Sequence, residues 1–404
     1  MDETPGLVTL AEVEAARGVV APVIRATYTD RSDNISKLCG RPILLKGEHQ
    51  QRTGSFKIRG AYNHISRLTG SGVEVVAASA GNHAQGVALA ATLCELRSTI
   101  FMPEAAPLPK VQATRAYGAD IRFVSGAVDD CLSDAKAYAS ETGAHFVPPF
   151  DDPLVIAGQG TIGLELVEQA PDAEVVVVPV GGGGLVSGIA LALAAIRPDV
   201  RVVGVEAEGA ASMVAALQLG RPTKLATVAT MADGIALKSP SALTLAHVQA
   251  FVDDVVTVTE EEIGRALIFL LERAKAVVEP AGAVSLAALL AGKIAGSGPA
   301  VAVLSGGNVD PLLLTKLIEH GLSAAGRYLR LRLVVPDRPG SLAIVTRTVA
   351  DLGLSVQEVD HNRAGAHVAI NEVEVLLTLE TRDPEHRDEA VEALRAHGFT
   401  VDVV

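Results

Sequence analysis

The sequence predicts an α/β protein built on parallel sheets, followed by a smaller unit of the ferredoxin-like type. Between residues 42 and 310, short runs rich in β-branched residues alternate with alanine-rich helical patterns. Several of these runs are apolar at consecutive positions, which is typical of strands buried on both faces. Beyond residue 326 lysine is absent while arginine is frequent, and this shift in composition indicates a domain boundary.

The first part of the chain places glycine-bearing loops directly after predicted strands. We expect strands at 42–48, 73–79, 98–103, 120–126, 173–180, 201–207 and 300–306, with helices such as 83–93 and 186–196 between them. The loops SAGNHAQ, GGGG and SGGN follow three of these strands. Because ligands bind at the carboxyl ends of parallel strands, the three loops are predicted to converge on one ligand.

The second part of the chain is expected to begin at residue 327, after a short linker at 323–326. Its pattern predicts a βαββαβ order, with strands at 328–336, 354–363, 367–381 and 399–404 and helices at 341–353 and 384–398. The turn Asp337–Gly340 stands between the first strand and a helix that begins at Ser341. Free backbone N–H groups there can take a small anionic ligand, or the turn only reverses the chain.

Composition excludes several classes of protein. A net charge of −13 argues against a broad basic surface for nucleic acid. Cys39, Cys94 and Cys131 show no CxxC spacing, so neither a disulfide framework nor a zinc site is expected. The acidic start lacks a signal-peptide pattern, and apolar stretches are broken by charges, proline or glycine. We therefore expect a cytoplasmic protein without membrane or nucleic-acid partners.

Lys57 stands in the mixed segment TGSFKIRGA, directly after Phe56. It is either an amine kept for covalent chemistry or, with Arg59, part of a solvated cationic face.

Gly181–Gly184 follow a buried strand and precede a helix, which suits the binding of a phosphate. A flexible turn is the alternative interpretation of this glycine run. A lysine, a separate phosphate cradle and polar glycine-rich loops together suit pyridoxal phosphate.

Five motifs, TGSFKIRGA, SAGNHAQGVA, PVGGGGL, VEPAGA and LSGGN, occur in this order. With these motifs, residues 5 to 320 closely resemble the fold-type II pyridoxal-phosphate enzymes, and within them the threonine ammonia-lyase group, near relatives of serine racemase. The C-terminal unit resembles an ACT domain, a regulatory module. The resemblance implies a catalytic domain over 1–322, with a small subdomain of about 53–145 inserted in the large one, a linker at 323–326 and an ACT domain over 327–404.

The resemblance also implies roles for particular residues. Lys57 would hold pyridoxal phosphate as a Schiff base and then remove the α-proton of the substrate. Cofactor contacts are implied for Phe56 beside the ring, Asn82 at the 3′-oxygen, Ser305 at the pyridine nitrogen and Gly181, Gly182, Gly183 and Gly184 at the phosphate. The substrate carboxylate is implied to bind the loop of Ser79, Gly81, Asn82 and His83.

Other positions keep two interpretations. His83 is either a proton-transfer group or a helix-start residue bonded to backbone. Glu279 is either a neighbour of the cofactor or a helix start. Asp233 and Gly234 form either a segment that closes the site or a turn.

Ala80 stands where related racemases carry a serine, which disfavours racemisation. Glu206 fits one acidic ligand of a cation site found in relatives, but Ser212 occupies the place of the second, so no metal is expected.

The implied activity is conversion of L-threonine to 2-oxobutanoate and ammonia, and of L-serine to pyruvate. The ACT unit is expected to pair in a homodimer or homotetramer and to bind an amino acid such as isoleucine near Asp337 to Leu342. Residues 361–363 face that pocket or solvent. A serine racemase, a hydroxyaspartate ammonia-lyase and a catalytically inactive amino-acid sensor remain as alternatives, and a biosynthetic or a catabolic role stays open.

Overall fold

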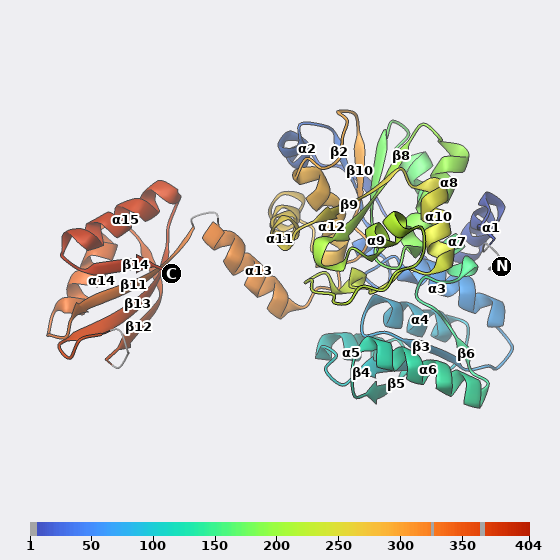
Figure 1. Ribbon diagram of the computed structural model, residues 1–404, viewed down its shortest axis with the longest axis horizontal. Helices are drawn as coiled ribbons and strands as arrows, with labels where there is room; N and C mark the ends of the chain where they lie inside the picture. Colours follow the sequence, from blue (N-terminus) through green and yellow to red (C-terminus); the bar gives the residue numbers. More distant parts are fainter. Residues whose placement is uncertain (1–5, 325–326, 364–367) are drawn as a thin grey trace. The chain divides into compact units, whose positions relative to one another are not determined.

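The strands between residues 29 and 303 form two separate sheets (Figure 1). The computed structural model describes residues 6–324, 327–363 and 368–404. The chain divides into two units, Met1–Asp310 and Pro311–Val404. Residues 325 and 326 of the expected linker lie outside the described residues, and the limits expected for the linker and the inserted subdomain stay predictions.

The larger sheet of the first unit has six strands, parallel except for the pairing of the first two. Their order is β1 (Thr29–Arg31), β2 (Ile43–Lys46), β10 (Ala300–Val303), β7 (Val175–Pro179), β8 (Arg201–Ala207) and β9 (Asp254–Val258). The smaller sheet is all parallel, in the order β5 (Asp120–Val124), β4 (Ser98–Pro103), β3 (Val75–Ala78) and β6 (His145–Phe146). The α/β class predicted from the sequence is confirmed.

Three strands were not predicted. β1 and β6 contain only three and two residues, too few for a periodic signal. β9 has a β-branched run, yet its side chains are mostly half-buried at the sheet edge. All three lie at the edge of a sheet, where the apolar pattern is weakest.

Helices cover the sheets of the first unit. They are α1 (Leu10–Val20), α2 (Asp33–Cys39), α3 (Lys57–Ile65), α4 (Asn82–Leu93), α5 (Leu108–Ala116), α6 (Val128–Thr142), α7 (Pro153–Gln169), α8 (Gly184–Ile196), α9 (Ser212–Leu219), α10 (Ala242–Phe251), α11 (Glu260–Phe269) and α12 (Pro280–Leu290). Within the part of the chain that is described, no helix is both long and apolar enough to cross a membrane.

The small sheet shows why its strands are continuous apolar runs. Val75 and Ala77 of β3 pack in one core with α3 and α4, whereas Val76 and Ala78 pack in another with Cys131 of α6. Both sets of alternating side chains are therefore buried. In the larger sheet, α7, α8 and α10 share a core with β7, β8 and β10, and α12 packs against the same strands.

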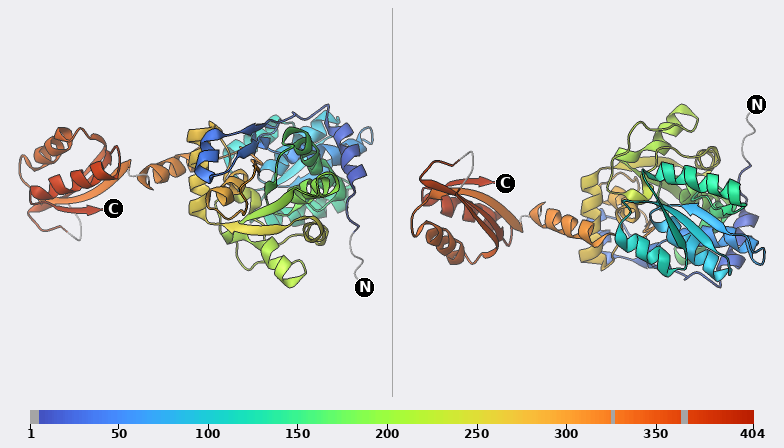
Figure 2. Two further views of the ribbon diagram at one scale, coloured as in Figure 1. Left: turned by 90° about the horizontal axis from the view of Figure 1, so that it is seen from above. Right: turned by 90° about the horizontal axis from the view of Figure 1, so that it is seen from below.

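The second unit contains α13 (Pro311–Ala324) and then an antiparallel sheet with two helices. The elements follow the order β11 (Tyr328–Pro336), α14 (Ser341–Asp351), β12 (Ser355–Asn362), β13 (Glu372–Glu380), α15 (Pro384–Ala396) and β14 (Thr400–Val403). The strand order is β12-β13-β11-β14, and both helices pack against one face, as two further views show (Figure 2). This confirms the ferredoxin-like prediction; residue 367, where β13 was expected to start, lies outside the described residues.

A buried ionic network fixes the start of α3 beneath Lys57. Arg59 donates to Glu48 at 2.7 and 2.9 Å and to Glu165 at 2.6 and 3.0 Å, and Lys46 donates to Glu165 at 2.6 Å. The side chains of Lys46, Glu48 and Arg59 are fully buried. Burial alone would raise the pKa of Glu48, but the Arg59 guanidinium outweighs this effect and holds the pKa below its ordinary value. The solvated cationic face considered for Arg59 is therefore wrong.

Arg59→Met is expected to lower the free energy of unfolding by about 3–5 kcal/mol, because it leaves the fully buried Glu48 carboxylate without its ion-pair partner. Urea denaturation measures this loss. Arg17→Met is the matched control, since Arg17 pairs with Glu168 at 3.1 Å on an exposed surface and such pairs are worth less than about 1 kcal/mol. Equal, small losses in both variants would contradict the role given to the network.

Candidate active site

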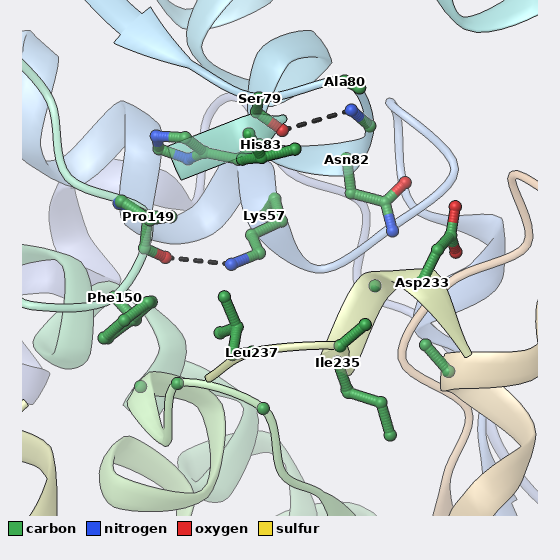
Figure 3. Close-up of a pocket in the computed structure, with 18 of the residues that line it drawn as sticks. Lys57, Ser79, Ala80, Asn82, His83, Pro149, Phe150, Asp233, Ile235 and Leu237 are labelled. Carbon is green, nitrogen blue, oxygen red and sulfur yellow. Dashed lines mark hydrogen bonds between the residues drawn. The ribbon is translucent and has the colours of Figure 1, made fainter. Parts of the chain in front are cut away.

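The three glycine-bearing loops line one cavity of about 470 Å³ in the first unit (Figure 3). All the residues assigned to the site from sequence lie on its wall: Phe56, Lys57, Ser79, Gly81, Asn82, His83, Gly181, Gly182, Gly183, Gly184 and Ser305. Ala80, Asp233, Gly234 and Glu279 line it as well. The strand ends of both sheets therefore supply one site, as the position of the loops predicts.

Lys57 is the first residue of α3 and turns its amine into the cavity. Its Nζ donates to the carbonyl oxygen of Pro149 at 2.9 Å and lies 5.1 Å from the centre of the Phe56 ring (Figure 3). Burial lowers the pKa of Lys57 from its ordinary 10.5 to about 8, while Glu279 acts in the opposite direction. A substantial fraction of the amine is thus neutral near physiological pH, which is the form that attacks an aldehyde.

Gly181–Gly184 form a backbone cradle at the start of α8. A Cβ on Gly182 would lie 2.2 Å from the Phe150 ring, and one on Gly181 would lie 2.9 Å from Cα of Ile235. Gly183 has a φ of +90°, a conformation that favours glycine. Backbone therefore replaces side chains at this wall, and the N–H groups of a helix start suit a phosphate. The flexible-turn alternative does not account for this close packing.

The segment from Ser79 to His83 leads from the end of β3 into the first turn of α4. Ser79 Oγ accepts from the backbone N–H of Gly81 at 3.1 Å (Figure 3). The His83 ring is buried, and its Nε2 lies 2.9 Å from the carbonyl oxygen of Val147. Burial, reinforced by Lys57, lowers the pKa of His83 to about 3. His83 is therefore a neutral ring that donates to backbone, which agrees with its interpretation as a helix-start residue bonded to backbone. Its contact with the substrate stays a prediction.

Asn82 and Glu279 form a polar pair on the cavity wall. Asn82 Nδ2 donates to Glu279 Oε1 at 2.5 Å. Burial, with a contribution from Asp233, raises the pKa of Glu279 to about 7. Glu279 also precedes Pro280 at the start of α12, so its helix-start interpretation holds, and its place beside the cofactor stays a prediction. Ser305 follows β10 and is 3% exposed, and its carbonyl accepts from the Phe56 N–H at 3.1 Å.

Two ion pairs at the cavity wall were not found from sequence. Lys110 of α5 pairs with Asp233, and Lys238 pairs with Asp129 of α6 at 3.1 Å. Pro149 and Phe150, which contact Lys57 and the glycine cradle, were also missed. Each of these contacts joins residues more than 30 positions apart, and no local motif records such a pairing.

The Glu206 carboxylate, one of the two positions considered for a cation site, is bonded to backbone. It accepts from the backbone N–H groups of Met213 and Val214 at 2.8 and 2.9 Å, in the first turn of α9. Burial raises the pKa of Glu206 to about 7. Among the described residues, no group of three or more histidine, cysteine or acidic side chains is placed to hold a metal ion.

These residues fit pyridoxal phosphate: an amine with a lowered pKa, a backbone cradle for a phosphate, and polar groups between them. Such a site on two parallel-sheet layers defines a fold-type II pyridoxal-phosphate-dependent enzyme. The family model described as a pyridoxal-phosphate dependent enzyme matches residues 20–306, and the model of the ACT domain matches residues 329–399.

Similar proteins narrow this assignment. An L-threonine ammonia-lyase of Thermotoga maritima is 46% identical over 98% of this chain and 100% of its own length, and one of Geobacter sulfurreducens is 46% identical over 94% and 96%. Among solved structures, the processed form of threonine deaminase isoform 2 from Solanum lycopersicum is 37% identical with a TM-score of 0.73, over 77% of this chain and 86% of that one. Maize serine racemase is 34% identical with a TM-score of 0.72, over 79% and 99%. The chain belongs to the pyridoxal-phosphate-dependent enzyme family, in its group of L-threonine ammonia-lyases with a C-terminal ACT domain.

Gly182→Ala is expected to lower the free energy of unfolding by about 1–3 kcal/mol, because the added Cβ meets the Phe150 ring. It is also expected to weaken binding of pyridoxal phosphate, measured by titration of the visible absorbance. Gly18→Ala is the matched control, since a Cβ there meets nothing within 4 Å in α1, and helix propensity predicts a gain of up to about 1 kcal/mol. Normal cofactor affinity in Gly182→Ala would show that the Gly181–Gly184 cradle does not bind the cofactor.

The rate at which cofactor-free protein takes up pyridoxal phosphate is expected to rise with pH, to reach half its maximum near pH 8, where half of Lys57 is neutral, and to level off above that pH. Stopped-flow absorbance over a pH series measures this profile. An exposed lysine, with a pKa of about 10.4, would give a rate that still rises at pH 10. A profile of that second kind would show that Lys57 does not react from a buried position.

Proposed function

We propose that the protein removes ammonia from L-threonine, giving 2-oxobutanoate, and from L-serine, giving pyruvate. The observation that carries the proposal is the placement of the Lys57 amine in the same cavity as the Gly181–Gly184 cradle and the Ser79–His83 loop. The similarity to L-threonine ammonia-lyases over nearly the whole chain supports the choice of substrate.

In this proposal each group of residues has one task. Gly181–Gly184 and Asn82 hold pyridoxal phosphate, which supplies an electron sink for the carbanion formed at the substrate α-carbon. The backbone at Ser79–His83 receives the substrate carboxylate at the start of α4. Lys57 Nζ then accepts the α-proton, a transfer that its lowered pKa favours. Ser305, which also lines the cavity, would hold the pyridine nitrogen of the bound cofactor.

The apolar residues of the cavity set the expected range of substrates. Phe150, Ile235 and Leu237 lie around Lys57 (Figure 3). One methyl group in such surroundings is worth about 1–3 kcal/mol, so threonine and serine should both react. Ala80 lies next to Ser79 and carries no hydroxyl. The chain thus lacks an acid at the position where related racemases carry one, which favours elimination over racemisation.

The ACT unit is the proposed regulatory site. Gly340, with a φ of +97°, turns the chain into α14, and Asp337 pairs with Arg363 at 3.0 Å. Arg363 therefore reaches the turn where an amino-acid effector such as isoleucine is proposed to bind. We also propose that this unit pairs two chains in a homodimer or homotetramer, and that the enzyme works in the cytoplasm.

Purified protein with pyridoxal phosphate is expected to release keto acid from threonine and serine, with kcat/KM values within about 200-fold of each other. Lys57→Ala should lower kcat for threonine by at least about 10²–10⁴-fold, because the base is lost. Lys37→Ala, an exposed lysine on α2, is the control. Turnover of 3-hydroxyaspartate without turnover of threonine would overturn the substrate, and no turnover of any of them would favour the sensor.

Isoleucine is expected to change the threonine activity of the native protein, and Gly340→Val should weaken that response at least about tenfold in effector concentration. Valine disfavours the left-handed conformation of residue 340, so the turn must rearrange. Gly398→Val is the matched control, because Gly398 has a φ of +79° in the same unit but lies after α15. Equal isoleucine responses in both variants would place the effector elsewhere.

A further inference from the structure

A chain of three side chains runs behind the cavity wall, from Asn308 through Asn82 to Glu279. Asn308 Nδ2 donates to Asn82 Oδ1 at 2.7 Å, and Asn82 Nδ2 donates to Glu279 Oε1 at 2.5 Å. Asn82 and Glu279 line the cavity, whereas Asn308 does not. We propose that Asn308 is a positioning residue that locks the Asn82 amide with its N–H groups toward the cavity. This inference rests on the proposed function.

The direction of the chain follows from a backbone carbonyl. Asn308 Nδ2 also donates to the carbonyl oxygen of Thr53 at 2.8 Å. A carbonyl only accepts, so the Asn308 atom beside it must be the amide nitrogen. The same nitrogen faces Asn82, which must therefore present its oxygen. The nitrogen of Asn82 is left to face Glu279 and the cavity, and an amide flip at either position would put two acceptors or two donors together.

One N–H of Asn82 remains for a ligand. Its Nδ2 carries two hydrogens, and one goes to Glu279. Within the described parts of the chain, no acceptor is found for the second. The Asn82 oxygen is occupied by Asn308, so the residue offers the cavity a donor and no acceptor. That face selects a ligand oxygen that carries negative charge, such as the 3′-oxygen of pyridoxal phosphate.

Asn308 is itself held firmly against the segment that carries Lys57. Gly54 has a φ of +70°, and a Cβ there would lie 2.4 Å from Asn308 Oδ1. The Gly307 N–H donates to the Gly54 carbonyl at 2.8 Å, and the Phe56 N–H donates to the Ser305 carbonyl at 3.1 Å. The segments 53–56 and 305–308 therefore lie in a fixed register, which gives Asn308 a defined place from which to orient Asn82.

The test compares Asn308→Asp with Asn308→Ala in the full-length protein. A carboxylate at 308 faces the Thr53 carbonyl and Asn82 Oδ1 with acceptors only, so Asn82 is expected to flip its oxygen toward the cavity. The Kd for pyridoxal phosphate, titrated by visible absorbance, should rise about tenfold in Asn308→Ala, from one lost hydrogen-bond constraint, and further in Asn308→Asp. Asn34→Asp, the same change at an exposed position of α2 in the same unit, should leave Kd within about twofold.

A double-mutant cycle separates positioning from general support. If Asn308 acts through Asn82, Asn308→Asp should change Kd by less than about twofold in an Asn82→Ala background. Equal effects of Asn308→Asp with and without Asn82 would overturn the proposal, as would a native Kd and absorbance band in Asn308→Asp. Failure of the native protein to bind pyridoxal phosphate would instead overturn the proposed function. Thermal melting of each variant identifies any loss of Kd that follows unfolding.

Discussion

The contact between the fully buried Arg59 and two carboxylates is the interaction on which the site depends. Arg59 stands two residues after Lys57 in the first turn of α3, and its partners Glu48 and Glu165 come from the segment after β2 and from α7. With Lys46, the network contains two cations and two anions. Burial is tolerable because every charge is paired. The start of α3 is thereby fixed to α7 and to the segment after β2, which gives the Lys57 amine a defined position.

Near that amine, glycine-bearing segments bring backbone close to the cavity. The ends of β7 and β10 lead into Gly181–Gly184 and into the Ser305 loop, and Gly182 and Gly54 leave no room for a Cβ. The hydrogen bonds between segments 53–56 and 305–308 connect the loop of Lys57 with the end of β10. The end of β10 and the segment that carries Lys57 are therefore held together at the cavity.

Much of the architecture could be predicted because its signals are local. Buried strands such as β7 are continuous apolar runs, and the glycine loops and Lys57 stand in short motifs. The solvated-face alternative for Arg59 could be dismissed only once Glu48 and Glu165 were seen beside it. Pro149 beneath Lys57 and the Lys110–Asp233 pair were invisible for the same reason. Contacts between distant segments depend on how elements pack, which spacing along one sequence does not record.

We propose that Lys57 carries the cofactor, and chemical mapping of the bound cofactor tests this assignment. The protein loaded with pyridoxal phosphate would be reduced with borohydride, digested and analysed by mass spectrometry. We expect one reduced cofactor per chain, on the peptide that contains Lys57, because this amine lies in the same cavity as the glycine cradle and has a lowered pKa. A label on Lys110, Lys238 or any other lysine, or no label on a protein that binds the cofactor, would contradict it.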